Sequence, residues 1–293
     1  MNYPHNVKIV EVGPRDGLQN ESKTISTADK IKFIELLSRS GLKEIEATSF
    51  VHPKAIPQLA DGDEVIKALN LKGPVLYSAL VPNMKGLERA IASGIKRIAV
   101  FTATSETFVK KNINMTIKES LDIFKPVIAS ALENKITVRG YVSTCFVCPY
   151  EGKIKKEAVS NVANSLFELG VDEVSLGDTI GAAVSKDVYE TIGHVLSKIS
   201  KDKIALHFHD TYGNALENVK AGLELGINIF DSSAGGIGGC PYAPGAAGNL
   251  ATESLLIMLD EMKIETGIRV DKITEASKFI NGIIGRKPIE KNL

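Results

Sequence analysis

Residues 204–232 read IALHFHDTYGNALENVKAGLELGINIFDS and contain one complete unit of the pattern that decides the fold. The β-branched and apolar run at 204–209 predicts a buried strand, and 215–225 has the apolar spacing of an amphipathic helix. Gly226 follows that helix, at a position where glycine readily adopts the left-handed conformation that ends a helix. The segment 227–232 then starts the next strand, so the unit predicts two parallel strands joined by a crossover helix.

The same unit recurs along the whole chain. Strands are predicted at 7–12, 44–49, 75–81, 95–102, 137–143, 173–176, 204–209 and 227–232, and helices at 28–40, 63–69, 84–93, 117–134, 156–169, 186–199, 215–225 and 249–262. Glycine also follows three other predicted helices, as Gly41, Gly94 and Gly170. Eight such units are typical of a closed parallel barrel.

The sequence therefore predicts an α/β protein with a single (β/α)8 TIM barrel, an architecture that needs about 250 residues. We expect one catalytic domain over 1–293, with the barrel at about 7–262 and a short helical extension at about 263–293. The alternative is an open doubly wound sheet. It is disfavoured because the first strand is followed by VGPRDG rather than by a G-x-G-x-x-G fingerprint.

Composition narrows the class of partner. The chain of 293 residues has 44% apolar and 24% charged residues, and its 35 basic side chains balance 35 acidic ones. This balance predicts no binding of nucleic acid or of an anionic membrane. No apolar run reaches the length of a membrane span, and the N-terminus does not resemble a signal or transit peptide. We expect a cytoplasmic protein, and three cysteines in a chain of this length do not indicate a disulfide scaffold.

Unusual polar residues stand where predicted strands end, which is where TIM barrels build their active sites. The strongest signal is His207 with His209, because residues i and i+2 of a strand face the same side. Two imidazoles at the mouth of a barrel can bind one metal ion, and the alternative is an ordinary hydrogen-bonded pair. Further polar positions at strand ends are Arg15, Asp16, Glu46, Ser49, Ser175 and Asp178.

Two residues could add oxygen ligands to the histidines. Asp16 could bind metal, but Asp-Gly is also a common turn dipeptide. Asn249 could do the same, but it directly precedes a predicted helix and could be its N-cap. A set of nitrogen and oxygen ligands without thiolate favours Mg²⁺ or Mn²⁺ over a structural zinc.

A glycine-rich segment, GGIGGCPYAPGAAGN at 235–249, follows the eighth predicted strand. It could close over the barrel mouth and bring Cys240 to the site, or it could be an inert loop. Cys145 and Cys148 form a C-x-x-C pair without a second ligand pair or a thioredoxin-like context. We interpret these two cysteines as structural.

Two motifs carry a resemblance to a known family. The stretch GPRDGLQ at 13–19 is similar to the first-strand motif of metal-dependent lyase and synthase barrels, and GGCPYAPGAAGN at 238–249 resembles the signature of 3-hydroxy-3-methylglutaryl-CoA lyases. The resemblance runs from about Val7 to Met262. The second motif is the specific one, because related synthases and aldolases share the first.

The resemblance implies roles for individual residues. It implies that a divalent cation is held by Asp16, His207, His209 and Asn249, with Glu253 as an acidic support behind that site. It implies catalytic roles for Arg15, Cys240 and Asp178, with His207 as the alternative general base. Ser254 departs from the family pattern, where aspartate is frequent. Candidate substrate contacts are Arg15, Gln19, Glu46, Ser49, Asn112 and Ser175; Lys110 and Lys111, beside Asn112, are interpreted as a solvated loop.

The implied reaction is the cleavage of 3-hydroxy-3-methylglutaryl-CoA to acetyl-CoA and acetoacetate, as in leucine degradation. The implied partners are this acyl-CoA and a second copy of the chain in a homodimer. Two rivals share the barrel and its histidines: a Claisen-type synthase that joins an acyl-CoA to a 2-oxo acid, and an aldolase for hydroxy-oxo acids. Cys240 favours cleavage over both. A non-catalytic barrel is disfavoured by the complete set of site residues.

Overall fold

A computed structural model of the chain describes residues 3–238 and 248–286. Its eight parallel strands close into a barrel in the order β1-β10-β9-β8-β5-β4-β3-β2, so the open sheet is excluded. The barrel strands are β1 (Lys8–Glu11), β2 (Glu44–Ser49), β3 (Leu76–Leu80), β4 (Arg97–Ala103), β5 (Thr137–Ser143), β8 (Glu173–Asp178), β9 (Ile204–Phe208) and β10 (Ile229–Ser232). All eight predicted strands are confirmed to within about two residues.

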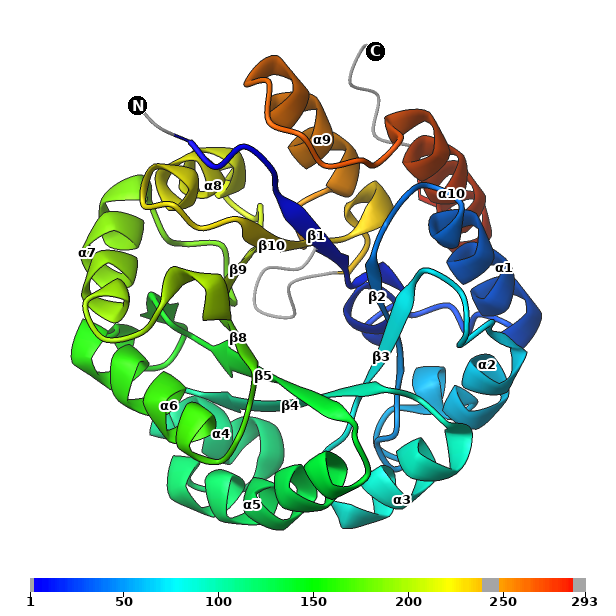
Figure 1. Ribbon diagram of the computed structural model, residues 1–293, viewed down its shortest axis with the longest axis horizontal. Coiled ribbons are helices and arrows are strands. Elements are labelled where there is room, and N and C mark those ends of the chain that lie inside the picture. The colour runs from blue at the N-terminus through cyan, green and yellow to red at the C-terminus, as the bar shows by residue number, and fades with distance from the viewer. Residues whose placement is uncertain (1–2, 239–247, 287–293) are drawn as a thin grey trace.

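Helices form a ring around the barrel, as Figure 1 shows in the view down its axis. They are α1 (Thr27–Ser38), α2 (Gly62–Ala68), α3 (Met84–Ser93), α4 (Glu106–Ile113), α5 (Ile117–Glu133), α6 (Lys156–Glu168), α7 (Ser185–Leu196), α8 (Ala215–Glu224), α9 (Thr252–Glu261) and α10 (Val270–Ile284). The predicted helix of the C-terminal extension is confirmed as α10, which packs against α1 and α9. The glycines expected after helices, Gly41, Gly94, Gly170 and Gly226, all have positive φ.

The hydrophobic core lies mainly between the strands and the surrounding helices. Phe33, Ile98, Ile128 and Leu206 are among its fully buried members. Two small apolar clusters lie inside the barrel, one of Val10, Val12, Ala205 and Ile229, the other of Leu80, Ala99 and Tyr141. Among the described residues, no helix combines the length and the apolar character that crossing a bilayer requires.

Several elements differ from the sequence-based expectation. Lys110, Lys111 and Asn112 lie in helix α4 and not in a loop, because Ser105 caps that helix by accepting the N–H of Phe108. The C-x-x-C segment leads into a small antiparallel hairpin of β6 (Val147–Cys148) and β7 (Gly152–Lys153). A π-helix, η1 (Gly13–Gly17), follows β1, and short 3-10 helices are η2 (Pro57–Leu59), η3 (Lys201–Lys203) and η4 (Ala234–Gly236).

Asn249 does not cap a helix. Helix α9 begins at Thr252, and its N-cap residue is Ala251. Asn249 instead forms an isolated β-bridge with His209, while Ala251 forms one with Ser233. These bridges hold the segment before α9 across the carboxyl ends of β9 and β10, which places the Asn249 side chain beside the second histidine.

Candidate active site

A cavity of about 580 Å³ opens at the carboxyl ends of the barrel strands. Seven of the predicted site residues line it: Arg15, Asp16, Gln19, Asn112, Ser175, His207 and His209. They come from the segments after β1 and β4 and from the ends of β8 and β9. The rest of the wall includes apolar side chains such as Ile56, Leu80 and Phe108. A small polar floor under a partly apolar wall is typical of a binding site for an organic ligand.

Three side chains converge on the floor of this cavity. Asp16, His207 and His209 each offer one ligand atom, and these atoms lie within 4.8 Å of one another. Burial raises the pKa of Asp16, but the charges of Arg15 and the two histidines outweigh it and lower that pKa to about 2. Burial and the neighbouring His207 lower the pKa of His209 to about 4, so its imidazole is neutral at pH 7. An ionised carboxylate beside a neutral imidazole is the protonation state that metal ligation needs.

Unpartnered polar atoms test whether these residues fit a cation. In the described part of the chain, His209 Nδ1 and Asn249 Oδ1 are buried without a hydrogen-bond partner. The Asn249 amide also touches the cluster, because its Nδ2 donates to Asp16 Oδ2 over 2.9 Å. Buried polar atoms left unsatisfied are costly, and a bound ion is one common explanation. The four predicted ligands therefore lie together, and the donor set fits a divalent cation.

Arg15 lies in η1 at the edge of the same cluster. Its Nε donates to Glu46 over 2.6 Å and its Nη1 donates to Asp16 over 2.8 Å, while the guanidinium lies over the Tyr141 ring at 5.2 Å. Burial lowers the pKa of Arg15, but the charges of Glu46 and Asp16 raise it by more, so the net pKa is above the ordinary value and the group stays cationic. Glu46 thus contributes to the site by orienting Arg15, and it does not line the cavity.

Two serines predicted as substrate contacts have different surroundings. Ser49 is fully buried, accepts the N–H of Val51 and donates to the Leu80 carbonyl, which orders the turn after β2. A register shift in β2 between Glu46 and Thr48 precedes it, and Ser49 does not line the cavity. Ser175 does line the cavity, and its hydroxyl donates to Asp231 over 2.7 Å.

The two remaining acidic candidates, Asp178 and Glu253, accept hydrogen bonds from the backbone of neighbouring segments. Asp178 ends β8, and its carboxylate accepts the N–H groups of Ala182 and Ala183. Burial, only partly offset by these bonds, raises its pKa to about 6, and it does not line the cavity. Glu253, in the first turn of α9, accepts the N–H of Gly235 in η4 and the Ser277 hydroxyl.

The cysteines divide into two groups. Cys240 lies outside the described residues. Cys145 and Cys148 are free and buried. The Cys145 thiol donates a hydrogen bond to the Val142 carbonyl, and the Cys148 thiol donates one to Ser105 Oγ. Burial raises the pKa of the Cys145 thiol far above its ordinary value. This thiol is therefore unreactive, in line with the structural interpretation of the pair.

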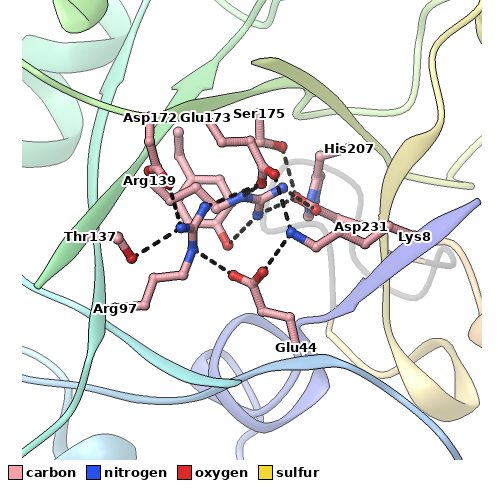
Figure 2. A network of polar contacts seen from close by, with 11 residues as sticks. Lys8, Glu44, Arg97, Thr137, Arg139, Asp172, Glu173, Ser175, His207 and Asp231 are labelled. Atoms are coloured by element: carbon pink, nitrogen blue, oxygen red, sulfur yellow. Dashed lines mark hydrogen bonds and ion pairs between the residues drawn. The ribbon is translucent and has the colours of Figure 1, made fainter. Parts of the chain in front are cut away.

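Sequence reasoning missed three buried residues beneath the site: Arg139, Tyr141 and Asp231. Arg139 donates to both oxygens of Asp231, and Asp231 in turn contacts His207 Nδ1 at 3.3 Å (Figure 2). Arg139 also donates to the Tyr141 hydroxyl, whose ring lines the cavity. A signal was available, because Arg139, Tyr141 and Ser143 alternate along one strand and must face the same side.

Comparison with known proteins gives concordant results. The HMGL-like family model matches residues 6–280. A hydroxymethylglutaryl-CoA lyase of Bacillus subtilis is 50% identical over 293 residues, which is 100% of this chain and 98% of that protein. The crystal structure of hydroxymethylglutaryl-CoA lyase from Pseudomonas aeruginosa matches with a TM-score of 0.96 at 46% identity and covers 98% of this chain and 96% of that chain. A structure of an HMG-CoA lyase from Acinetobacter baumannii in complex with coenzyme A and 3-methylmalate has a TM-score of 0.93 at 38% identity, covering 99% and 95%.

Proposed function

The chain belongs to the HMGL-like family, and we propose that it is a carbon–carbon lyase that cleaves 3-hydroxy-3-methylglutaryl-CoA to acetyl-CoA and acetoacetate. The observation that carries this proposal is the cluster of Asp16, His207 and His209 next to the buried guanidinium of Arg15. The synthase and aldolase alternatives are not favoured, because the relatives described above are lyases and match this chain over nearly their whole length.

The proposed cation site consists of Asp16, His207, His209 and Asn249, with Mg²⁺ or Mn²⁺ as the ion. When bound, such an ion supplies Lewis acidity that makes the 3-hydroxyl of the substrate easier to ionise. Glu253 supports the site from behind by fixing η4 through Gly235.

Cleavage needs the hydroxyl proton to leave and one carbon–carbon bond to break. The oxygen electrons then form the ketone of acetoacetate, and the electrons of the broken bond form the enolate of acetyl-CoA. Arg15, held by Glu46 and Asp16, is a permanent cation that can stabilise the enolate oxygen. We assign protonation of the enolate carbon to Cys240, because a thiol is a better proton donor for such a step than a hydroxyl group.

The general base is assigned to Asp178, with His207 as the alternative. The raised pKa of Asp178, about 6, gives it a proton affinity suited to a base near neutral pH. Its oxygens are bonded to the turn at Ala182 and Ala183, so reaching the substrate requires that turn to move. His207 has one nitrogen beside Asp231 and the other available to the cation, which leaves no free nitrogen for a proton.

Gln19, Ser175 and Asn112 line the cavity and are assigned to substrate contact, while Glu46 and Ser49 contribute through Arg15 and the turn after β2. The complex of the Acinetobacter baumannii relative with coenzyme A supports an acyl-CoA substrate. We further propose that the whole chain works as one catalytic domain, in a cytoplasmic homodimer that serves leucine degradation and binds neither nucleic acid nor membrane.

A direct assay tests the proposed function. Purified protein is incubated with 3-hydroxy-3-methylglutaryl-CoA, with and without Mg²⁺ or Mn²⁺, and acetyl-CoA release is measured. We expect turnover that chelation abolishes, and His209→Ala should weaken metal binding by about tenfold or more. Full activity of the metal-free protein would exclude the metal-dependent mechanism. Absence of cleavage in the presence of either ion would exclude the substrate.

A further inference from the structure

Charged side chains occupy the amino-terminal half of the barrel interior, where barrels usually carry branched apolar ones. Figure 2 shows these residues joined by hydrogen bonds and ion pairs into one network that ends at His207. The network contains three cations and four carboxylates: Lys8, Arg97, Arg139, Glu44, Asp172, Glu173 and Asp231.

Asp231 is the member of this network that touches the proposed metal site. Its Oδ1 accepts Arg139 Nη2 over 2.6 Å, and its Oδ2 accepts Arg139 Nη1 over 3.2 Å and the Ser175 hydroxyl over 2.7 Å. The same Oδ2 lies 3.3 Å from His207 Nδ1. Asp231 is 1% exposed, so this geometry is held by packing as well as by charge. Beside an ionised carboxylate that can only accept, His207 Nδ1 has to be the donor.

We propose that Asp231 is a positioning residue that keeps the His207 proton on Nδ1 and so presents the Nε2 lone pair to a divalent cation. Metal-binding histidines commonly donate their other ring N–H to a carboxylate, which fixes both tautomer and ring orientation. Arg139 keeps Asp231 ionised and aimed, and Glu173 holds Arg139 from the other side over 2.6 Å. The inference rests on the metal site of the proposed function but not on the identity of the substrate.

The tautomer can be read in the wild-type protein without any metal. The chain has five histidines, so the ¹⁵N NMR spectrum of protein labelled with ¹⁵N-histidine contains few imidazole signals. Comparison with the spectrum of His207→Gln identifies the signals of His207. In alkaline buffer, where the imidazole is neutral, we expect a protonated Nδ1 and an unprotonated Nε2 at His207. The opposite tautomer would overturn the inference, whatever any variant does.

A matched pair of variants separates positioning from simple loss of charge. Asp231→Asn keeps the shape of the side chain, but its amide can donate to Nδ1 and favours the other tautomer. Glu173→Gln removes a carboxylate from the same Arg139 without touching His207. Both variants leave that buried arginine undercompensated, so both should lower stability.

Metal affinity is then measured by titrating each folded protein with Mn²⁺ in a calorimeter. We expect Asp231→Asn to bind about tenfold or more weakly, with the His207 tautomer altered, and Glu173→Gln to resemble the wild type in both measurements. Wild-type affinity in Asp231→Asn, or equal losses in both variants, would overturn the inference alone. A wild-type protein that binds no Mn²⁺ would overturn the proposed metal site and the inference together.

Discussion

We expect the proposed role of Arg15 to depend on the geometry of its guanidinium as well as on its charge. Nε and Nη1 are directed to two different carboxylates, Glu46 and Asp16, which fixes the plane of the group. Arg15→Lys keeps the charge but loses this planar set of donors. We expect a large fall in kcat with a modest change in KM, because the proposed contact with the enolate oxygen would strengthen in the transition state. Steady-state kinetics checks this, and a change confined to KM would make Arg15 a substrate clamp.

Cys240 is the residue whose chemistry most clearly favours cleavage. A serine hydroxyl has a similar shape but is far less acidic than a thiol, so it donates a proton poorly. We expect Cys240→Ser to keep metal and substrate binding and to lose about 10²-fold or more in kcat. Thiol alkylation should inactivate the wild type, with protection by substrate, and the same reagent on Cys240→Ser controls for Cys145 and Cys148. Turnover of Cys240→Ser at the wild-type rate would remove the assigned proton transfer.

Glu11 is a fully buried carboxyl group that joins three segments around the site. Its Oε1 accepts the N–H groups of Gly13 and Ala234, and its Oε2 accepts the Thr252 hydroxyl. Burial, only partly offset by these hydrogen bonds, raises its pKa from 4.5 to about 8. The folded protein therefore binds more protons than the unfolded chain between these pH values, and stability falls as the pH rises through that window.

Glu11→Gln replaces this group by an uncharged one of the same shape. We expect the stability of Glu11→Gln relative to the wild type to increase steadily from about pH 5 to about pH 8, because only the wild type has to ionise a buried carboxyl group. Urea denaturation of the metal-free proteins at several pH values measures the difference. A difference that does not change with pH would show that Glu11 has an ordinary pKa in the folded state.

At the scale of elements, the π-helix η1 places Arg15 and Asp16, and its close packing requires glycine at its end. A Cβ atom at Gly17 would lie 2.6 Å from Ile237 Cγ1 and 3.0 Å from Ser233 Oγ. Gly17→Ala should therefore push η1 away from η4, at a cost of about 1–3 kcal/mol. We expect weaker Mn²⁺ binding and lower kcat, because the displaced element carries a proposed ligand.

Gly193→Ala is the matched control for that substitution. Gly193 lies inside α7, and a Cβ atom there would meet nothing within 4 Å. Alanine in such a helix position should raise stability by about 0.8–1 kcal/mol without changing activity. Thermal denaturation and Mn²⁺ titration of both variants make the comparison. Equal behaviour of the two variants would mean that the contact between Gly17 and Ile237 relaxes without cost.

Sequence reasoning succeeded for elements whose signal is periodic and failed where the signal is tertiary. The strand of His207 and His209 could be predicted because its apolar run and the following helix are local features. The π-helix could not, since its hydrogen bonds to the Val12 carbonyl depend on packing against η4. The partnership of Arg139 with Asp231 was also missed, because the two residues are 92 positions apart in the chain.

At the scale of the whole molecule, the barrel separates packing from chemistry. Apolar side chains fill the layer between the strands and the helices. The barrel interior carries the charged network of Figure 2 toward the amino-terminal ends of the strands and the candidate site at their carboxyl ends. The sequence predicted the closed barrel, because eight strand–helix units leave few other ways to cover both faces of a parallel sheet. It also predicted which strand ends would meet, because the carboxyl ends of the strands form the active-site face of such a barrel.

The charged network also limits the route by which substrate enters the barrel and products leave it. Arg97, Glu44 and Glu173 are buried at the amino-terminal end and close it within residues 3–238 and 248–286, while the cavity opens at the opposite face. The two products of cleavage must then leave through the same opening by which the substrate entered. We therefore expect a product bound deep in the cavity to leave only after the product nearer to the opening has gone.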